Sequence, residues 1–386
     1  MGGGHTHALV LRKWAMDPLP GAQVTFVNPG VKAPYTGMLP GFVAGHYTRD
    51  ELDIDLVKLT RQAGARLIVD RAIGIDTANK RVHLQGRPDI DYNTLSIDIG
   101  ITSKIPDLAF NHSRIVPAKP LGRFADAWAQ LLAHARDSGT APKIAIVGGG
   151  VAGVELALAM AHRMGEIGHD TPSITILESG DTLLRELNRS ARRKLQSEMA
   201  EADIQIQTQA DGSDLAKDAD FVVSAAGATP HAWIAQTNLA VDSGYIQVDK
   251  HLRSLNTPDV FAAGDCAHLS YAPRPKAGVF AVRQAPVLFH NLRAHLSGGK
   301  FTSYAPQKTY LKLISLGRKS AVTDKWGVGL SGGWVWTWKD RIDQAFMAQF
   351  RKIQPMPAPK QPVSMALGVA ELLAQHDHAC GACGAK

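Results

Sequence analysis

Two glycine-rich turns constrain the fold of this 386-residue chain more than any other feature of its sequence. The first covers residues 2–7 (Gly-Gly-Gly-His-Thr-His) and the second covers residues 148–153 (Gly-Gly-Gly-Val-Ala-Gly). Apolar residues 143–147 predict a buried strand before the second turn, and residues 154–164, rich in Ala, Leu and Met, predict a helix after it. Strand, glycine turn and helix in this order bind the pyrophosphate of a dinucleotide. Two such turns predict two dinucleotide sites in one α/β protein.

The second turn has the complete glycine pattern. Gly148 allows the tight turn, Gly150 lets the backbone approach a pyrophosphate, and Gly153 lets helix and strand pack closely. The next expected strand, residues 174–177, ends at Glu178, whose carboxylate can accept hydrogen bonds from ribose hydroxyls and would repel a 2′-phosphate. The turn therefore predicts a site for NADH, although the interval to Glu178 is longer than the usual ~20 residues.

The first turn departs from this pattern in three ways. Gly2 and Gly4 repeat it, but His7 replaces the third glycine and Asn28, after an expected strand at residues 23–27, replaces the ribose-binding acid. No strand precedes Gly2 in the sequence. Because that strand would lie in the centre of a doubly wound sheet, we expect an apolar strand upstream of Met1 in the natural chain.

The composition excludes several classes of protein. A hydrophobic content of 45% and a charged content of 20% are typical of soluble globular proteins. The net charge is +7, but the densest basic segment, residues 185–194, has the spacing of one solvated helix face, and no nucleic-acid-binding module is present. The longest uncharged run, residues 221–241, is too polar to span a bilayer, and no signal peptide is visible. We expect a cytoplasmic protein without a nucleic-acid partner.

A third motif, residues 256–265 (Asn-Thr-Pro-Asp-Val-Phe-Ala-Ala-Gly-Asp), predicts a strand that ends at Gly264 and places Asp265 near a ribityl hydroxyl. Together with the two turns, it resembles the pyridine nucleotide-disulfide oxidoreductase superfamily over about residues 1–300. Residues 96–100 and 224–227, which end in Gly100 and Gly227, resemble the crossovers of that family beside FAD and NAD. Glu155 matches its acid near the nicotinamide.

This resemblance implies an α/β fold with two Rossmann-like three-layer domains, the NAD domain inserted in the FAD domain, and a small C-terminal α+β region. The expected boundaries are 1–106 and 240–300 for the FAD domain, 107–239 for the NAD domain, 301–353 for the C-terminal region, and 354–386 for a linker with the start of a further domain.

The resemblance also narrows the chemistry. The paired cysteines of disulfide reductases are absent between residues 28 and 60, where residues 34–41 (Pro-Tyr-Thr-Gly-Met-Leu-Pro-Gly), including Pro40, resemble the flavin-facing loop of type II NADH dehydrogenases and sulfide:quinone oxidoreductases. Cys266 fits a small buried side chain that packs as a hydrophobic residue. Because sulfide-oxidising enzymes of this family need redox cysteines, this interpretation disfavours sulfide oxidation. Residues 310–317 and 320–322 predict strands, and residues 338–351 predict a helix. That region fits core or homodimer packing, or a quinone or membrane-surface edge that includes Trp334, Trp336 and Trp338.

The C-terminal residues leave three interpretations open. Cys380 and Cys383, near His376 and His378, could supply zinc or redox ligands, and the segment also fits a disordered tail. The third interpretation is a resemblance to the opening motif of selenide, water dikinase, in which Cys383 and Lys386 match the reactive cysteine and the catalytic lysine. The flavoprotein that occurs fused before this kinase shares the 34–41 loop and the pattern of residues 338–343. No complete kinase domain is present, and we predict no metal site.

The sequence therefore predicts an FAD-dependent NADH:acceptor oxidoreductase. The second substrate is a small-molecule acceptor, either a selenium or sulfur compound that supplies selenophosphate synthesis or, as the alternative, a quinone at a peripheral membrane contact. A non-catalytic redox-sensing flavoprotein, or an NAD-binding protein without flavin, stays open. The expected FAD residues are Gly2, Gly4, Asn28, Pro40, Gly100, Gly264 and Asp265, and the expected NAD residues are Gly148, Gly150, Gly153, Glu155, Glu178 and Gly227.

Overall fold

The computed structural model describes residues 1–104, 114–169, 173–210, 218–325 and 327–351. All described elements belong to one compact unit, Met1–Ile353. The predicted tail with Cys383 and Lys386, and residues 105–113 at the expected boundary between the FAD and NAD domains, lie outside the described residues.

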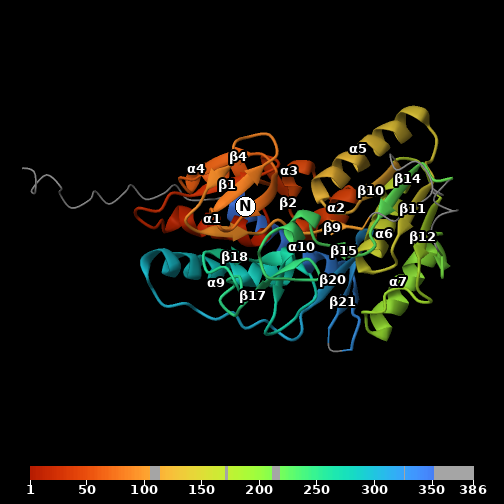
Figure 1. Cartoon of the computed structure of the whole chain (residues 1–386). Coiled ribbons are helices and arrows are strands. Elements are labelled where there is room, and N and C mark those ends of the chain that lie inside the picture. Colours follow the sequence, from red (N-terminus) through yellow and green to blue (C-terminus); the bar gives the residue numbers. More distant parts are fainter. Residues whose placement is uncertain (105–113, 170–172, 211–217, 326, 352–386) are drawn as a thin grey trace, which may run out of the picture. The chain divides into compact units, whose positions relative to one another are not determined.

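The second glycine turn follows the carboxyl end of the central strand of a parallel sheet. Within the described residues, this sheet has five strands in the order β10-β14-β11-β12-β13. Its strands are β10 (Ile115–Pro117), β11 (Ile144–Val147), β12 (Ile174–Glu178), β13 (Gln205–Thr208) and β14 (Phe221–Ser224). Nearly every residue of β11 and β14 is buried, as expected for parallel strands that are covered on both faces. Figure 1 shows β11, β12 and β14 side by side in the yellow and green part of the chain.

Three helices accompany this sheet: α5 (Leu121–Ser138), α6 (Val151–Glu166) and α7 (Arg189–Glu201). The predicted strand at 143–147 and helix at 154–164 are confirmed as β11 and α6. Helix α6 begins at Val151, earlier than predicted, because the third glycine of the turn, Gly153, belongs to its first turn. The predicted basic helix face at 185–194 is confirmed only in part, because α7 begins at Arg189 and Arg185 lies in the segment before it.

The first glycine turn joins two pairs of parallel strands. β1 (Thr25–Asn28) pairs with β4 (Arg66–Val69), and β8 (Leu95–Ile97) pairs with β18 (Val260–Ala262). Residues Met1 and Gly2 contact both pairs, because Gly2 N–H donates to Val27 O at 2.8 Å and Asp98 N–H donates to Met1 O at 2.9 Å. The two pairs are therefore bridged at the carboxyl ends of β1 and β8, where the turn begins.

Helix α1 (His5–Met16) follows this turn and packs against α9 (Gly278–Ser297) and α4 (Leu56–Gln62). Short elements complete this part of the chain. They are β2 (Lys32–Pro34), η1 (Thr36–Met38), α2 (Leu39–Val43), α3 (Arg49–Leu52), β3 (Asp53–Asp55), β5 (Ala72–Asp76), β6 (Arg81–Leu84), β7 (Ile90–Asp91), β9 (Thr102–Ser103), β15 (Ala228–Thr229), η3 (Ala232–Gln236), β16 (Val241–Asp242), β17 (Tyr245–Val248), η4 (Gly264–Cys266) and β19 (Ala267–Leu269).

The C-terminal region is an antiparallel sheet with one helix. β20 (Lys312–Leu316), β21 (Arg318–Asp324) and β22 (Ser331–Gly332) pair in that order, and α10 (Gly333–Arg351) follows. The predicted strands are confirmed, and the predicted helix begins at Gly333 instead of Trp338. The buried Val335 and Lys339 continue the inward face of α10 into this extra turn.

The α/β fold class predicted from the sequence is confirmed. None of the helices in the described ranges combines the length and the apolar character that crossing a membrane requires.

Candidate functional site

The second turn has the close backbone approaches that a nucleotide cradle needs. Gly148 has φ +114°, and a Cβ atom there would lie 2.8 Å from the amide nitrogen of Ala226. A Cβ atom on Gly153 would overlap the carbonyl oxygen of Gly148. Gly150 precedes the first residue of α6 in extended conformation. The turn is therefore closed so tightly that only glycine fits at 148 and 153, and the N-terminus of α6 opens beside it, which fits a dinucleotide pyrophosphate.

Glu178 is held at the end of β12 by the turn itself. Its Oε2 accepts a hydrogen bond from Gly149 N–H at 2.8 Å, and its Oε1 accepts one from Gly180 N–H at 2.8 Å. Asn28 has the equivalent position at the end of β1, where its Oδ1 accepts from Gly3 N–H at 2.8 Å. The two turns thus share one arrangement, in which the residue that follows the second strand is bonded to the middle glycine.

His7 has the position in the first turn that the third glycine, Gly153, has in the second turn. Its Nδ1 lies 2.9 Å from Gly2 O, and its Nε2 lies 2.7 Å from Ser96 Oγ. Burial lowers the pKa of this imidazole well below its ordinary value. The neutral ring therefore connects α1 to β8 through hydrogen bonds.

Asp98 is a buried acid that the sequence analysis did not single out. It is 2% exposed, and its Oδ2 accepts a hydrogen bond from His7 N–H, in the first turn of α1, at 3.0 Å. Cβ atoms on Gly4 or Gly264 would overlap its carboxylate. Burial raises the pKa of Asp98 to about 7. The signal was present in the sequence as an acid directly after an apolar strand.

Asp265, which was predicted to lie near a ribityl hydroxyl of FAD, forms an ion pair with a lysine from the expected NAD domain. Lys119 Nζ lies 2.9 Å from Asp265 Oδ2. His5, at the start of α1, lies near this pair, and burial lowers its pKa to about 4. The ring of His5 makes an edge contact with Tyr35 at 5.2 Å between centroids. Lys119 was not predicted as a site residue, because it lies far from Asp265 in the sequence and the two meet only in the folded chain.

The loop at residues 34–41 is fixed by α10. Lys339 Nζ donates to Gly37 O at 2.7 Å and lies 2.6 Å from Asp343 Oδ2. Tyr35 Oη donates to Asp343 Oδ1 at 3.1 Å. Pro40 is buried at the start of α2. Residues 338–343, which in the sequence only resembled part of a known flavoprotein, thus supply the side chains that hold the predicted flavin-facing loop.

Glu155 connects the second turn to the same region. Its Oε1 accepts a hydrogen bond from Ser315 N–H of β20 at 2.7 Å. Burial raises the pKa of Glu155 to about 7, and the positive charge of Lys339 acts in the opposite direction. A proton can therefore be held at the carboxyl of Glu155 near neutral pH.

Gly100 and Gly227, the predicted crossover glycines, both have left-handed backbone, with φ of +68° and +62°.

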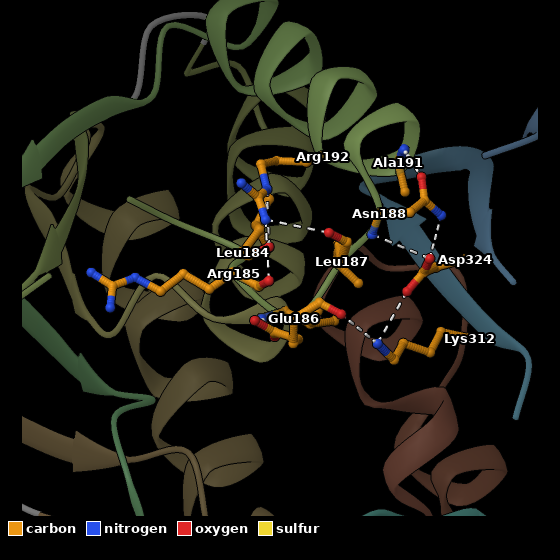
Figure 2. Close-up of polar contacts among 10 residues, drawn as sticks. Leu184, Arg185, Glu186, Leu187, Asn188, Ala191, Arg192, Lys312 and Asp324 are labelled. Atoms are coloured by element: carbon orange, nitrogen blue, oxygen red, sulfur yellow. Dashed lines mark hydrogen bonds and ion pairs between the residues drawn. The ribbon is translucent and has the colours of Figure 1, made fainter. Parts of the chain in front are cut away.

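The segment 181–188 lies directly on the second turn. Leu184 N–H donates to Gly149 O at 3.0 Å, and the exposed carboxylate of Glu186 accepts from Val151 N–H of α6 at 3.1 Å. Figure 2 shows how its backbone is held, with Arg192 bonded to three of its carbonyl oxygens and Lys312 Nζ donating to Glu186 O at 3.0 Å. The backbone of this segment is fixed, whereas the Glu186 carboxylate is open to displacement by an anion.

Comparison with known proteins identifies the family. The profile described as pyridine nucleotide-disulphide oxidoreductase matches residues 2–285. The chain belongs to this family.

The chain is similar to several quinone-reducing proteins. It is 35% identical over 94 residues to the mitochondrial sulfide:quinone oxidoreductase of Schizosaccharomyces pombe, over 24% of this chain and 20% of that protein. It is 29% identical over 210 residues to the demethylphylloquinone reductase NdbB of Synechocystis, over 49% of this chain and 50% of that protein. The chain thus spans half or less of the length of these curated relatives. The sulfide:quinone oxidoreductase structure from Aquifex aeolicus has the same fold, with a TM-score of 0.71 and 16% identity over 92% of each chain.

Cys266 is fully buried, and burial raises its pKa to about 12. It is the only cysteine in the described ranges, and its thiol lies against the carbonyl oxygens of Ile97 and Ala263. Such a thiol is neutral and packed, as the sequence analysis predicted. No three His, Cys, Asp or Glu side chains gather as a metal centre in the part of the chain that the structure describes.

Proposed function

We propose that this chain is an FAD-dependent NADH:acceptor oxidoreductase, which passes a hydride from NADH to FAD and then delivers electrons to a second small molecule. The observation that supports the proposal is that residues of both predicted sites lie near Lys339 of α10. Lys339 holds the flavin-facing loop through Gly37 and lies near Glu155, which comes from the helix of the second turn. Both cofactors would thus end in the same region. The redox chemistry is that of the bound cofactors, while the protein supplies position and electrostatics.

The residues divide the work in the following way. Gly148, Gly150 and Gly153 would hold the pyrophosphate of NADH and Glu178 its ribose, with Glu155 near the nicotinamide. Gly2, Gly4, Asn28, Pro40, Gly100, Gly264 and Asp265 would hold FAD, and Gly227 would lie beside the NADH crossover. Lys119, 2.9 Å from Asp265, would balance the charge of that carboxylate beside the flavin.

The visible spectrum of the purified full chain, recorded before and after anaerobic addition of NADH, tests this proposal. We expect a flavin spectrum that NADH bleaches within turnover time. Bound flavin that NADH does not reduce would indicate a non-catalytic redox-sensing module. A colourless protein that takes up no FAD would overturn the proposal.

The second substrate that we propose is a selenium or sulfur compound. This proposal rests on the resemblance of residues 34–41 and 338–343 to the flavoprotein fused before selenide, water dikinase, and on the match of Cys383 and Lys386 to the opening motif of that kinase. Reoxidation of the reduced flavin by selenite or polysulfide, compared with a short-chain quinone, tests it. Faster reoxidation by the quinone would favour the alternative.

The alternative, a quinone reached at a membrane surface, has its own supporting observation. Trp334, Trp338 and Ile342 form an exposed stripe on α10, since they follow one another at intervals of four residues and are 57%, 42% and 45% exposed. Arg341 is exposed beside them. Such a stripe fits the interfacial layer of an anionic membrane. Co-sedimentation with anionic vesicles, lost in the W334S/W338S variant, is the expected result.

A further inference from the structure

The N–H groups of the first glycine turn are bonded within the chain itself. Those of Gly2 and Gly4 donate to the carbonyl oxygens of Val27 and Asp98, at 2.8 and 3.1 Å. That of Gly3 donates to Asn28 Oδ1 at 2.8 Å. The first turn of α1 is bonded as well, because His7 N–H donates to Asp98 Oδ2 at 3.0 Å. A negative group therefore already lies at the helix end where a dinucleotide fold holds its pyrophosphate.

The position of Asp98 is built into the fold. Its carboxylate lies between Gly4 and Gly264, and a Cβ atom at either glycine would overlap it. Both glycines were predicted to lie against FAD. The structure gives a second reason, since they also leave room for the Asp98 side chain.

The second turn provides a contrast. There the carboxylate that accepts a helix N–H, from Val151, belongs to Glu186, which is exposed and can swing into solvent. Asp98 is 2% exposed and cannot leave in this way. An anionic ligand at α1 must therefore be bound together with Asp98, which is compatible with burial only when the carboxyl is neutral.

We propose that Asp98 is a positioning residue for FAD, whose protonation is required for tight binding of the FAD diphosphate at the N-terminus of α1. This inference rests on the use of FAD in the proposed function. When Asp98 is protonated, it adds no charge beside the diphosphate. When Asp98 is ionised, two like charges lie at one helix end and FAD binds more weakly.

Burial also shifts the pKa values of other titratable groups around Asp98, and it shifts them away from neutral pH. Burial lowers the pKa of the Met1 amino group to about 5 and that of His5 to about 4, and it lowers the pKa of His7 well below its ordinary value. Cys266 has a pKa raised to about 12. Asp265 faces Asp98 from η4 and is ion-paired with Lys119. Asp98, with its pKa raised to about 7 by burial, therefore changes charge near neutral pH.

The test is the FAD dissociation constant of the full chain between pH 6 and pH 8, measured by flavin fluorescence after equilibrium dialysis. For the wild-type protein we expect about a tenfold increase, as linkage requires when binding depends on protonation of a group with pKa near 7. For Asp98→Asn, whose amide oxygen can still accept the His7 N–H, we expect less than a twofold change. Asp98→Ser, which retains a smaller acceptor, should behave in the same way if Asp98→Asn folds poorly.

Asp91→Asn is the matched control, because Asp91 lies in the same part of the chain and its side chain is 76% exposed. It should keep the wild-type pH dependence. The inference is overturned if Asp98→Asn and Asp98→Ser keep that dependence, or if they weaken FAD by one constant factor at every pH, as a merely structural role would. Failure of all variants and the wild type to bind FAD would overturn the proposed function as well.

Discussion

Glu155 has a carboxyl group whose burial affects the stability of the whole protein. Its pKa is raised to about 7 in the folded state, above the value of an unfolded chain, because burial disfavours the charged form. The protonated form therefore favours folding. This contribution to the free energy of unfolding is complete below the unfolded pKa and is lost as the pH rises through about 7.

Glu155→Gln should remove this loss, since the amide oxygen can still accept the hydrogen bond from Ser315 N–H. We expect thermal unfolding of the variant and the wild type to coincide near pH 5, and the variant to be more stable by several degrees at pH 8. Each unit of pKa difference corresponds to about 1.4 kcal/mol. Glu201→Gln, at an exposed position of α7, should show no such pH-dependent difference. A constant difference at all pH values would contradict the assignment.

Glu178 should determine which nicotinamide nucleotide is used. It is held by Gly149 and Gly180 at the predicted adenosine ribose position, and the guanidinium of Arg185 lies next to Gly180. Glu178→Ser removes a carboxylate that would repel a 2′-phosphate and leaves Arg185, which is paired with the exposed Asp181 at 2.6 Å, as the nearby cation. We expect kcat/KM for NADH to fall about tenfold, the equivalent of one lost hydrogen bond of about 1.4 kcal/mol, and kcat/KM for NADPH to rise. An unchanged ratio of the two constants would exclude the predicted role.

At the scale of elements, α10 holds the 34–41 loop through a buried ion pair. The side chains of Lys339 and Asp343 are 11% and 6% exposed, and each also bonds to the loop. Removing one partner of a buried ion pair leaves the other charge uncompensated and typically lowers the free energy of unfolding by about 3–5 kcal/mol. The loop should therefore depend on both residues together.

Asp343→Ala should lower the free energy of unfolding by about 3 kcal/mol, because Lys339 stays buried without its counter-charge. The double variant Lys339→Met/Asp343→Leu should recover most of this loss. Urea unfolding at pH 7 measures both. Asp137→Ala, at an exposed position of α5, is the control and should change stability by less than about 0.5 kcal/mol. A double variant as unstable as Asp343→Ala would show that the pair itself stabilises the protein.

The elements that the sequence predicted correctly depend on local patterns. β11, α6 and β12 follow from apolar runs on either side of glycines, and the position of Glu178 follows from the end of a strand. The groups that were missed meet over long separations. The partners of Asp98, Lys119 and Lys339 are 91, 146 and 302 residues away in the chain. No periodicity records such contacts, so the carboxylate beneath α1 and the hold of α10 on the loop required the folded structure.

At the scale of the whole molecule, the net charge of +7 should affect how NADH reaches its site. The basic residues nearest the second turn lie on the 181–188 segment and on α7, where Arg185, Arg189 and Arg193 are exposed. NADH is an anion, so this field should attract it at low ionic strength. The attraction is screened as the Debye length falls from about 30 Å at 0.01 M salt to about 10 Å at 0.1 M.

We therefore expect the second-order rate constant of flavin reduction by NADH, measured by anaerobic stopped flow, to fall about tenfold between 0.01 M and 0.5 M salt. Arg185→Gln/Arg189→Gln should reduce this dependence, and Arg136→Gln, on the exposed end of α5, should leave it unchanged. The oxidative half-reaction then distinguishes the proposed acceptors. The rate constant of flavin reoxidation by an anion such as selenite should fall with salt, as that of reduction by NADH does. The rate constant for a neutral quinone should change less than about twofold, because the field acts only on charged ligands. A rate constant for NADH that is independent of salt would show that local carboxylates, Glu178 and Glu186 among them, cancel the net charge at the site.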